Sequence, residues 1–378
     1  MKIKELWIYP VKGCQGINIP RAQLTPSGFL YDRAFCIIDL DGQIVSKHEA
    51  ISMRKLPCLA TIKISISVED NLLRLESTDK DPIELPLEEG EYVDSPDVMV
   101  ECSGKSTTTG GGWSLGFIPS KLANNSVNEW ISSYLNAQIY PGKLRHGKSK
   151  TSRFAIARSM STIKLCDYPP IFPIIEIGKR DGRFDKNEKR FSDFAPFLIC
   201  NQASLEAVKI MGNVDEYPMS SMRASIIVDS KEAWEEETWS EILIKSPNNT
   251  MVTMKKIKEC PRCTVPCRNP TSGEFLFKEK LLLWKLLKKA FPTKANDPEW
   301  GTWAGVFFGV YFGRASQQGT LHVGDTITVL QDETEGKNLH HIRDATFNRN
   351  PRKLILKIVF AVLLFLLLRR ARSAFKIA

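Results

Sequence analysis

The chain has 378 residues, enough for two domains, and its hydrophobic and charged fractions of 43% and 25% are typical of a globular protein. Residues 343–378 contribute +8 of the net charge of +9, and 43 basic and 42 acidic side chains precede them. This balance leaves no basic stripe with interleaved aromatic residues, so we expect no nucleic-acid partner. Nine cysteines without a signal peptide or presequence predict reducing conditions.

Residues 1–102 are expected to be mainly β, because β-branched and aromatic residues gather in short segments. These segments are residues 5–9, 34–39 and 59–68. Asp41 and Gly42 predict a hairpin turn that leads into a strand at residues 43–46. Residues 107–112 are rich in Thr and Gly and predict a flexible loop.

Ser126 and Glu129 form a capping box, which predicts a helix with Ser126 as its N-cap that runs to about Leu135. Residues 141–190 are basic, interrupted by prolines and poorly patterned. We interpret them as a linker and an early loop of a second domain.

Strand patterns dominate the second half of the chain, with a helix expected over residues 201–210. The strand segments are residues 196–200, 224–229, 240–245 and 250–254. No βαβ rhythm and no G-x-G-x-x-G motif is present, which argues against a doubly wound nucleotide-binding fold. The predicted fold class is mainly β with short helices (α+β).

Three cysteines lie on a proline-broken loop, residues 258–273, at the end of a predicted strand. They are Cys260, Cys263 and Cys267. Reactive groups tend to be carried on such loops. The nearby Lys258, Arg262 and Arg268 are expected to favour the thiolate form, which is both a nucleophile and a metal ligand.

Four interpretations of these thiols stay open from the residues alone. Cys260 and Cys263 have zinc-like spacing, but no second pair follows and the five histidines are scattered. A redox disulfide would be expected at a strand-to-helix turn of a βαβ unit. The remaining two are plain buried or loop cysteines, and one thiolate that binds a soft or mid-series metal.

Residues 275–291 predict a basic amphipathic helix, which either packs on its own domain or lies on an anionic membrane. Residues 354–368 are apolar except for Lys357, and basic residues flank them on both sides. A helix of this length spans roughly 22 Å, and snorkelling Lys and Arg extend it toward the roughly 30 Å hydrocarbon core. We therefore expect a C-terminal transmembrane helix at residues 351–378. It would anchor a cytosol-facing body in the mitochondrial outer membrane or, alternatively, the endoplasmic reticulum.

Four regions, in register, resemble the MOSC (molybdenum cofactor sulfurase C-terminal) family and the β-barrel domain that precedes it. They are residues 6–14 (LWIYPVKGC) with 31–35 (YDRAF), 191–199 (FSDFAPFLI), 260–263 (CPRC) with 269–273 (NPTSG), and 308–311 (FGVY) with 319–330 (GTLHVGDTITVL). The resemblance implies an N-terminal β-barrel-like domain at residues 1–140 and a MOSC β-barrel domain at residues 141–335. A linker at residues 336–350 would then lead to the anchor.

MOSC proteins bind the molybdenum cofactor, an anionic pterin phosphate whose dithiolene holds the metal. By this resemblance Cys263 is the molybdenum ligand and catalytic residue, and Cys260 is a neighbour that shapes the loop. The residues implied in cofactor binding are Lys12, Gly13, Arg33, Ser192, Asp193, Arg223 and Ser225. Lysine offers phosphate a point charge and arginine a planar fork. Without the resemblance, solvated charges, a surface ion pair and a turn would explain the same residues.

The chain departs from the family pattern near the implied site. Ala224 and Ser225 replace the usual Pro-Asn, so a small polar group remains but the amide is lost. Gly13 stands where serine is commoner, and Ala195 where serine is frequent. Cys267 is an added thiol near the implied metal position.

The domain order with a membrane anchor is most similar to the amidoxime-reducing members of the family. This implies reduction of N-hydroxylated substrates (amidoximes, hydroxylamines, N-oxides) with electrons from NADH through cytochrome b5 reductase and cytochrome b5. Familiar members carry the anchor at the N-terminus rather than the C-terminus. The alternatives are a cofactor carrier or sulfur-transfer protein and a non-catalytic membrane adaptor. No pyridoxal phosphate, haem or flavin site is expected.

Overall fold

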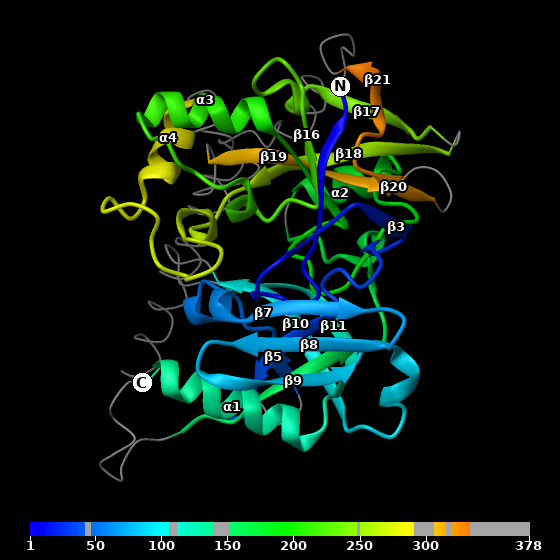
Figure 1. The fold of residues 1–378 in the computed structure, drawn as a ribbon. Helices are drawn as coiled ribbons and strands as arrows, with labels where there is room; N and C mark the ends of the chain where they lie inside the picture. Colours follow the sequence, from blue (N-terminus) through cyan, green and yellow to red (C-terminus); the bar gives the residue numbers. More distant parts are fainter. Residues whose placement is uncertain are drawn as a thin grey trace, which may run out of the picture. The chain divides into compact units, whose positions relative to one another are not determined.

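The computed structural model describes residues 1–41, 47–105, 112–139, 151–171, 173–247, 250–290, 306–314 and 319–332. These residues form a mainly β structure with few helices, which confirms the expected fold class (Figure 1). In this part of the chain, no helix combines the length and apolarity needed to cross a membrane. The expected linker at 336–350 and tail anchor at 351–378 lie outside the described residues.

Eight strands form a nearly closed barrel. In order across the sheet they are β2 (Ile17–Ile19), β1 (Ile3–Ile8), β16 (Ile226–Val228), β15 (Phe197–Asn201), β19 (Phe307–Arg314), β18 (Met251–Pro261), β17 (Trp239–Lys245) and β21 (Thr326–Asp332). Strand β21 comes back to β1 through a bridge between Lys2 and Thr326. Apolar side chains such as Trp239, Phe197 and Phe312 pack together in the core of this sheet.

The other large group of strands comprises two sheets and a helix. The first sheet is ordered β5 (Phe35–Asp39), β12 (Phe154–Ser159), β11 (Gly112–Leu122), β10 (Asp97–Lys105) and β6 (Lys47–Glu49), and the second β7 (Lys63–Ser67), β8 (Leu72–Ser77) and β9 (Lys80–Pro86). Helix α1 (Asn125–Ile139) contacts β12 and β9 and buries Val127, Ile131 and Leu135 in their shared core.

Short elements complete the described structure. They are β3 (Arg21–Thr25), β4 (Gly28–Phe29), β20 (Thr320–His322), β13 (Ile163–Lys164), β14 (Glu188–Lys189), α2 (Pro173–Arg180), α3 (Gln202–Gly212) and α4 (Leu282–Ala290). Asn201 caps α3, because its side chain accepts a hydrogen bond from the backbone N of Ala203.

In the sequence, the strands of the nearly closed barrel lie partly before and partly after the other group of strands. Strand β1 pairs antiparallel with β16, placing Leu6 opposite Ile226, so the N-terminus belongs to the nearly closed barrel. The loop after β1 is tied to the other group, since the Lys12 backbone N donates to the Phe35 carbonyl at 2.8 Å. This loop therefore lies at the junction of the two groups, where it carries Lys12 and Gly13.

The linker interpretation of residues 141–190 is wrong for the part that the structure describes. Strand β12 is buried along its whole length and pairs with β5 and β11. Arg158 made this segment look polar, but its guanidinium is buried, lies 5.0 Å from the Phe35 ring centroid and donates to the Leu87 carbonyl. Residues 140–150 lie outside the described residues.

Helix boundaries also differ from the prediction. Helix α1 begins at Asn125 and ends at Ile139, and the Asn124 side chain, not Ser126, accepts from the backbone N of Val127 at 3.0 Å. Helix α4 begins only at Leu282 and buries Leu283 and Leu287 in its own domain. The apolar face of α4 is thus packed internally. The strand predicted at residues 43–46 and nearly all of the loop predicted at 107–112 lie outside the described residues.

Candidate functional site

A cleft of about 790 Å³, partly continuous with solvent, lies at the junction of the two groups of strands. Every residue that the sequence resemblance implicated lines it. These are Lys12, Gly13, Arg33, Ser192, Asp193, Arg223, Ser225 and Cys263. They come from five separate segments of the chain, so the fold brings together residues that are as far apart as 251 positions in sequence.

Cys263 follows the end of β18 and precedes a short 3₁₀ helix, η7 (Val265–Cys267). It is partly exposed in the cleft, whereas Cys260 and Cys267 are buried. All three are free thiols. Among the described residues, no group of three or more His, Cys, Asp and Glu is arranged to hold a metal ion. Cys263 is therefore the thiol of the motif that a ligand in the cleft can reach.

Gly273 holds the other end of the cysteine loop against the N-terminal half of the chain. Its φ of +74° lies in the region that favours glycine, and a Cβ there would come within 2.1 Å of the Pro57 carbonyl oxygen. Arg268 further closes the loop by donating to the Gly273 carbonyl at 2.8 Å. The glycine of this stretch thus permits a tight backbone approach to Pro57.

The expected net preference of Cys263 for the thiolate form is wrong, although nearby cations do act in that direction. Burial raises the pKa of the Cys263 thiol, and the charges of Arg54 and Arg262 do not outweigh it. Arg262 turns away and donates to the Cys260 sulfur at 3.0 Å and to the Met222 carbonyl at 2.7 Å. Lys258 lies 4.8 Å from the Phe194 ring centroid, in cation–π geometry. Sequence proximity did not show where these side chains point.

Lys12 and Asp193 form an ion pair at the cleft wall. The Lys12 Nζ lies 2.5 Å from the Asp193 carboxylate and also donates to the Phe191 carbonyl at 2.8 Å. Enclosure by protein opposes ionisation of Asp193, but the charges of Lys12 and Arg54 hold its pKa well below the usual range. Because 69% of the Asp193 side chain is exposed, solvent screens this pair and we assign it little stability.

Arg33 and Arg223 share one aromatic ring. Each guanidinium carbon lies 4.3 Å from the centroid of the buried Tyr9 ring. Arg33 forms an ion pair with the buried Asp32 and donates to the Arg223 carbonyl at 3.1 Å, and Arg223 donates to the Cys14 carbonyl at 2.8 Å. Burial lowers the pKa of Arg223; Tyr9 opposes this effect and Arg33 adds to it. An anion bound in the cleft would therefore stabilise the charged form of Arg223.

Two hydroxyl residues and a glycine complete the predicted set. Ser192 Oγ is buried and has no hydrogen-bond partner among the described residues, so it is available to a ligand. Ser225 is buried, and its backbone N donates to the Leu198 carbonyl at 2.9 Å. Gly13 has a φ of +89°, and a Cβ there would lie 2.7 Å from a Leu59 methyl group. The glycine thus fits the backbone of the loop that presents Lys12.

The sequence analysis did not single out Tyr311 or Met53 as cleft residues. Tyr311 lies on β19 and burial raises the pKa of its hydroxyl well above the usual range, so it stays protonated. Met53 lines the cleft and its sulfur lies 3.7 Å from Arg223 Nη1. Tyr311 ends the family-like motif at residues 308–311, and it adds a hydroxyl to the largely apolar strand Phe307–Arg314; these were the available signals.

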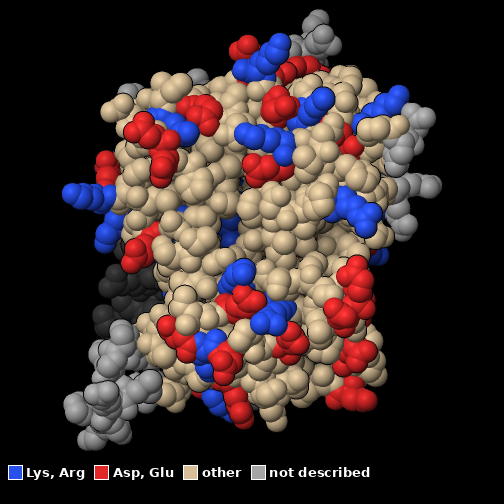
Figure 2. Space-filling view, in the orientation of Figure 1, with Lys and Arg blue, Asp and Glu red and all other residues tan. Residues whose placement is uncertain are grey.

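Charge outside the cleft is mixed. On the face shown in Figure 2, Lys and Arg side chains are interspersed with Asp and Glu side chains. This pattern agrees with the near balance of charge before residue 343. The cleft cations are thus distinguished by their convergence on one hollow and not by a general excess.

Comparison with known families identifies the class of protein. Residues 1–138 match the MOSC N-terminal beta barrel domain, and residues 186–328 match the MOSC domain. The chain therefore belongs to the MOSC-domain proteins that carry this N-terminal domain. The MOSC family, with the relatives below, points to molybdenum-cofactor binding.

The chain is similar over most of its length to mitochondrial amidoxime reducing components. It is 27% identical over 330 residues to component 2 of Bos taurus, which covers 86% of this chain and 82% of the relative. The human component 2 is 26% identical over 330 residues, with the same coverage. The human molybdenum cofactor sulfurase is 22% identical over 352 residues, which covers 89% of this chain and 33% of that protein.

Proposed function

We propose that the chain is a molybdenum-cofactor-dependent oxidoreductase that reduces N-hydroxylated substrates such as amidoximes, hydroxylamines and N-oxides. One observation carries the proposal: the partly exposed Cys263 thiol shares a cleft with the cations of Lys12, Arg33 and Arg223. The similarity to amidoxime reducing components supports the reaction class.

The residues of the cleft fit an anionic pterin with a thiolate-bound metal. Lys12, Arg33 and Arg223 would hold the phosphate and pterin. The Ser192 hydroxyl, which has no partner among the residues that the structure describes, would offer a further hydrogen bond. Gly13, Asp193 and Ser225 would line the remaining wall, and Cys263 would ligate molybdenum. The bound cofactor supplies two-electron oxygen-atom transfer.

The chain's own groups would orient substrate and hold protons near Cys263. Tyr311 keeps its hydroxyl proton and presents a neutral donor at the cleft. Asp193 stays ionised beside Lys12 and accepts hydrogen bonds, for example from an N–OH group. Leu198, Met222 and Val265 line the cleft with apolar surface that limits water.

Electrons would come from a cytochrome b5-type donor and its NADH-dependent reductase, as the similarity to amidoxime reducing components suggests. Residues 351–378 would anchor the chain, with its body facing the cytosol, in the mitochondrial outer membrane, with the endoplasmic reticulum as the alternative. Deleting residues 351–378 should move the protein from the membrane pellet to the soluble fraction. Retention of the truncated chain in the pellet after a salt wash would argue against the anchor.

The decisive test compares Cys263→Ser with Cys166→Ser, because Cys166 is also partly exposed but lies outside the cleft. Molybdenum content, pterin fluorescence after oxidation and benzamidoxime reduction are measured on the full chain. We expect wild type and Cys166→Ser to hold stoichiometric molybdenum and reduce the substrate, and Cys263→Ser to lose the reduction. Equal reduction by all three proteins would refute the proposal.

A second candidate is a cofactor carrier or sulfur-transfer protein, which the similarity to the human molybdenum cofactor sulfurase favours. Such a protein would hold molybdenum and pterin through the same cleft but would not reduce benzamidoxime with a supplied cytochrome b5 system. A non-catalytic membrane adaptor would hold neither molybdenum nor pterin.

A further inference from the structure

A buried lysine behind the cleft has no place in the proposed chemistry. Lys189 ends the short strand β14, where it pairs with Ile163 of β13, and only 1% of it is exposed. Burial lowers the pKa of its ammonium group. A buried cation is costly unless it is well hydrogen-bonded, so the contacts of this residue call for an explanation.

Lys189 binds the backbone of the cleft wall and does not reach into the cleft. Its Nζ donates to the Ser192 carbonyl at 2.8 Å and to the Asp193 carbonyl at 3.2 Å. It also lies 5.9 Å from the Tyr168 ring centroid, with the Cys102 thiol beside it. One ammonium thus fixes the two consecutive carbonyl groups of Ser192 and Asp193, the residues whose side chains line the cleft.

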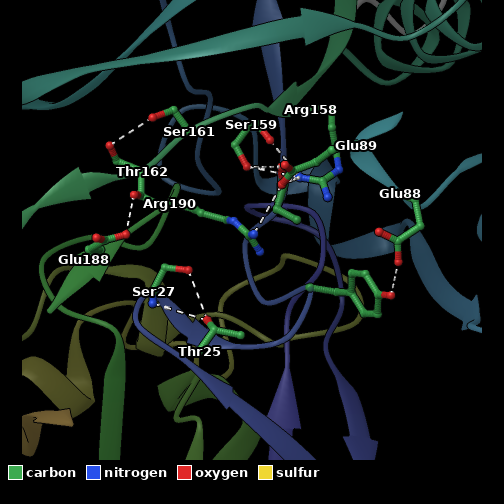
Figure 3. A network of polar contacts seen from close by, with 12 residues as sticks. Thr25, Ser27, Glu88, Glu89, Arg158, Ser159, Ser161, Thr162, Glu188 and Arg190 are labelled. Atoms are coloured by element: carbon green, nitrogen blue, oxygen red, sulfur yellow. Dashed lines mark hydrogen bonds and ion pairs between the residues drawn. The ribbon is translucent and has the colours of Figure 1, made fainter. Parts of the chain in front are cut away.

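The neighbouring residues hold the same segment from other directions. Arg190 reaches Glu89, which also pairs with Arg158, at N–O distances of 3.4 and 3.3 Å (Figure 3). The Phe191 backbone N donates to the Arg33 carbonyl at 3.2 Å. These contacts fix where the segment lies, and Lys189 fixes how its Ser192–Asp193 turn is oriented.

The orientation of this turn matters because Asp193 is an exposed carboxylate close to several cations. It pairs with Lys12, and its charge also acts on Arg33 and Arg223. A turn free to rotate would let this carboxylate move onto those guanidiniums, where it would compete with an anionic ligand.

We propose that Lys189 is a positioning residue that keeps the Asp193 carboxylate on Lys12, so that Arg33 and Arg223 stay available to an anion in the cleft. This inference rests on the proposed function, which needs an anion-binding cleft. It assigns Lys189 a role in ligand binding through the orientation of another side chain.

The test is a double-mutant cycle on the cofactor-free full chain, with inorganic phosphate as the probe and titration calorimetry as the readout. We expect Lys189→Met to weaken phosphate binding roughly tenfold. Asp193→Asn removes a negative charge from the cleft and frees Lys12, so it should tighten phosphate binding modestly in the wild-type background. In the Lys189→Met background the same substitution should tighten it by a clearly larger factor and restore most of the lost affinity. Lys164→Met, an exposed lysine on the adjacent strand, is the matched control and should bind as wild type does.

Additivity would overturn the inference. If Asp193→Asn changes phosphate affinity by the same factor in both backgrounds, Lys189 acts only through its own charge. If Lys189→Met proves insoluble, Lys189→Gln, which keeps a donor but no charge, takes its place in the cycle. Failure of the wild-type chain to bind phosphate would refute the anion-binding cleft itself, and with it both proposals.

Discussion

The shared ring of Tyr9 gives a sharp test of how the cleft holds two like charges together. Both guanidinium carbons lie 4.3 Å from its centroid, so they are at most 8.6 Å apart. At an effective dielectric constant of about 20, two unit charges at that separation repel by roughly 2 kcal/mol. Two desolvated cation–π contacts of up to about 2 kcal/mol each can offset this repulsion.

Replacing Tyr9 with leucine or with phenylalanine should therefore have opposite effects. Tyr9→Leu removes the π face and leaves a cavity, and we expect it to lower the free energy of unfolding by about 3–5 kcal/mol. Tyr9→Phe keeps the ring and removes a buried hydroxyl that has no hydrogen-bond partner in the described part of the chain. We expect Tyr9→Phe to be neutral or to stabilise by about 1 kcal/mol.

Urea unfolding at pH 7 followed by fluorescence measures both effects. A double-mutant cycle of Tyr9→Leu with Arg223→Met separates the cation–π term from the cavity term, and we expect a coupling of about 1–2 kcal/mol. A Tyr9→Phe variant as unstable as Tyr9→Leu, or a coupling near zero, would refute this account of the ring.

Two further predictions concern stability. Burial raises the pKa of Glu236 to about 7, although Ser204 donates to both carboxylate oxygens, at 2.9 and 2.8 Å. Because the folded-state pKa is raised, the protonated acid contributes stability that is fully present below about pH 4.5 and is lost as the pH rises through about 7. We expect this loss to be about 3 kcal/mol in the free energy of unfolding. Glu236→Gln should not show it when urea unfolding is measured at pH 5 and at pH 8. The same change in unfolding free energy in wild type and Glu236→Gln would contradict the burial argument. Gly273→Ala should destabilise the chain by about 3 kcal/mol or more, because its Cβ would meet the Pro57 carbonyl at 2.1 Å with φ at +74°. Gly90→Ala is the control, since its Cβ would meet no atom of the described residues within 4 Å, and equal stabilities of the two variants would contradict the prediction.

Local patterns in the sequence were sufficient for much of the strand content. The apolar run before Asn201 became β15, buried throughout, because a strand covered on both faces needs no polar alternation. The same rule failed at β12, because Arg158 breaks the apolar pattern. Its buried guanidinium is stabilised by the Phe35 ring, the Leu87 carbonyl and the Glu89 carboxylate. Asn124 and Ser126 are similar as helix caps, so their sequence alone did not decide between them.

The sequence by itself determined which chemical groups are available: three thiols in a proline-broken loop, and the lysine and arginines of the family motifs. Only the tertiary structure decided that these groups meet, because contacts such as that between Arg223 and Cys14 depend on β1 pairing with β16 across the sheet. It also decided their electrostatic state. The pKa of Cys263 depends on how many protein atoms exclude water from the thiol and on where Arg262 points, and neither quantity can be read from the order of residues along the chain.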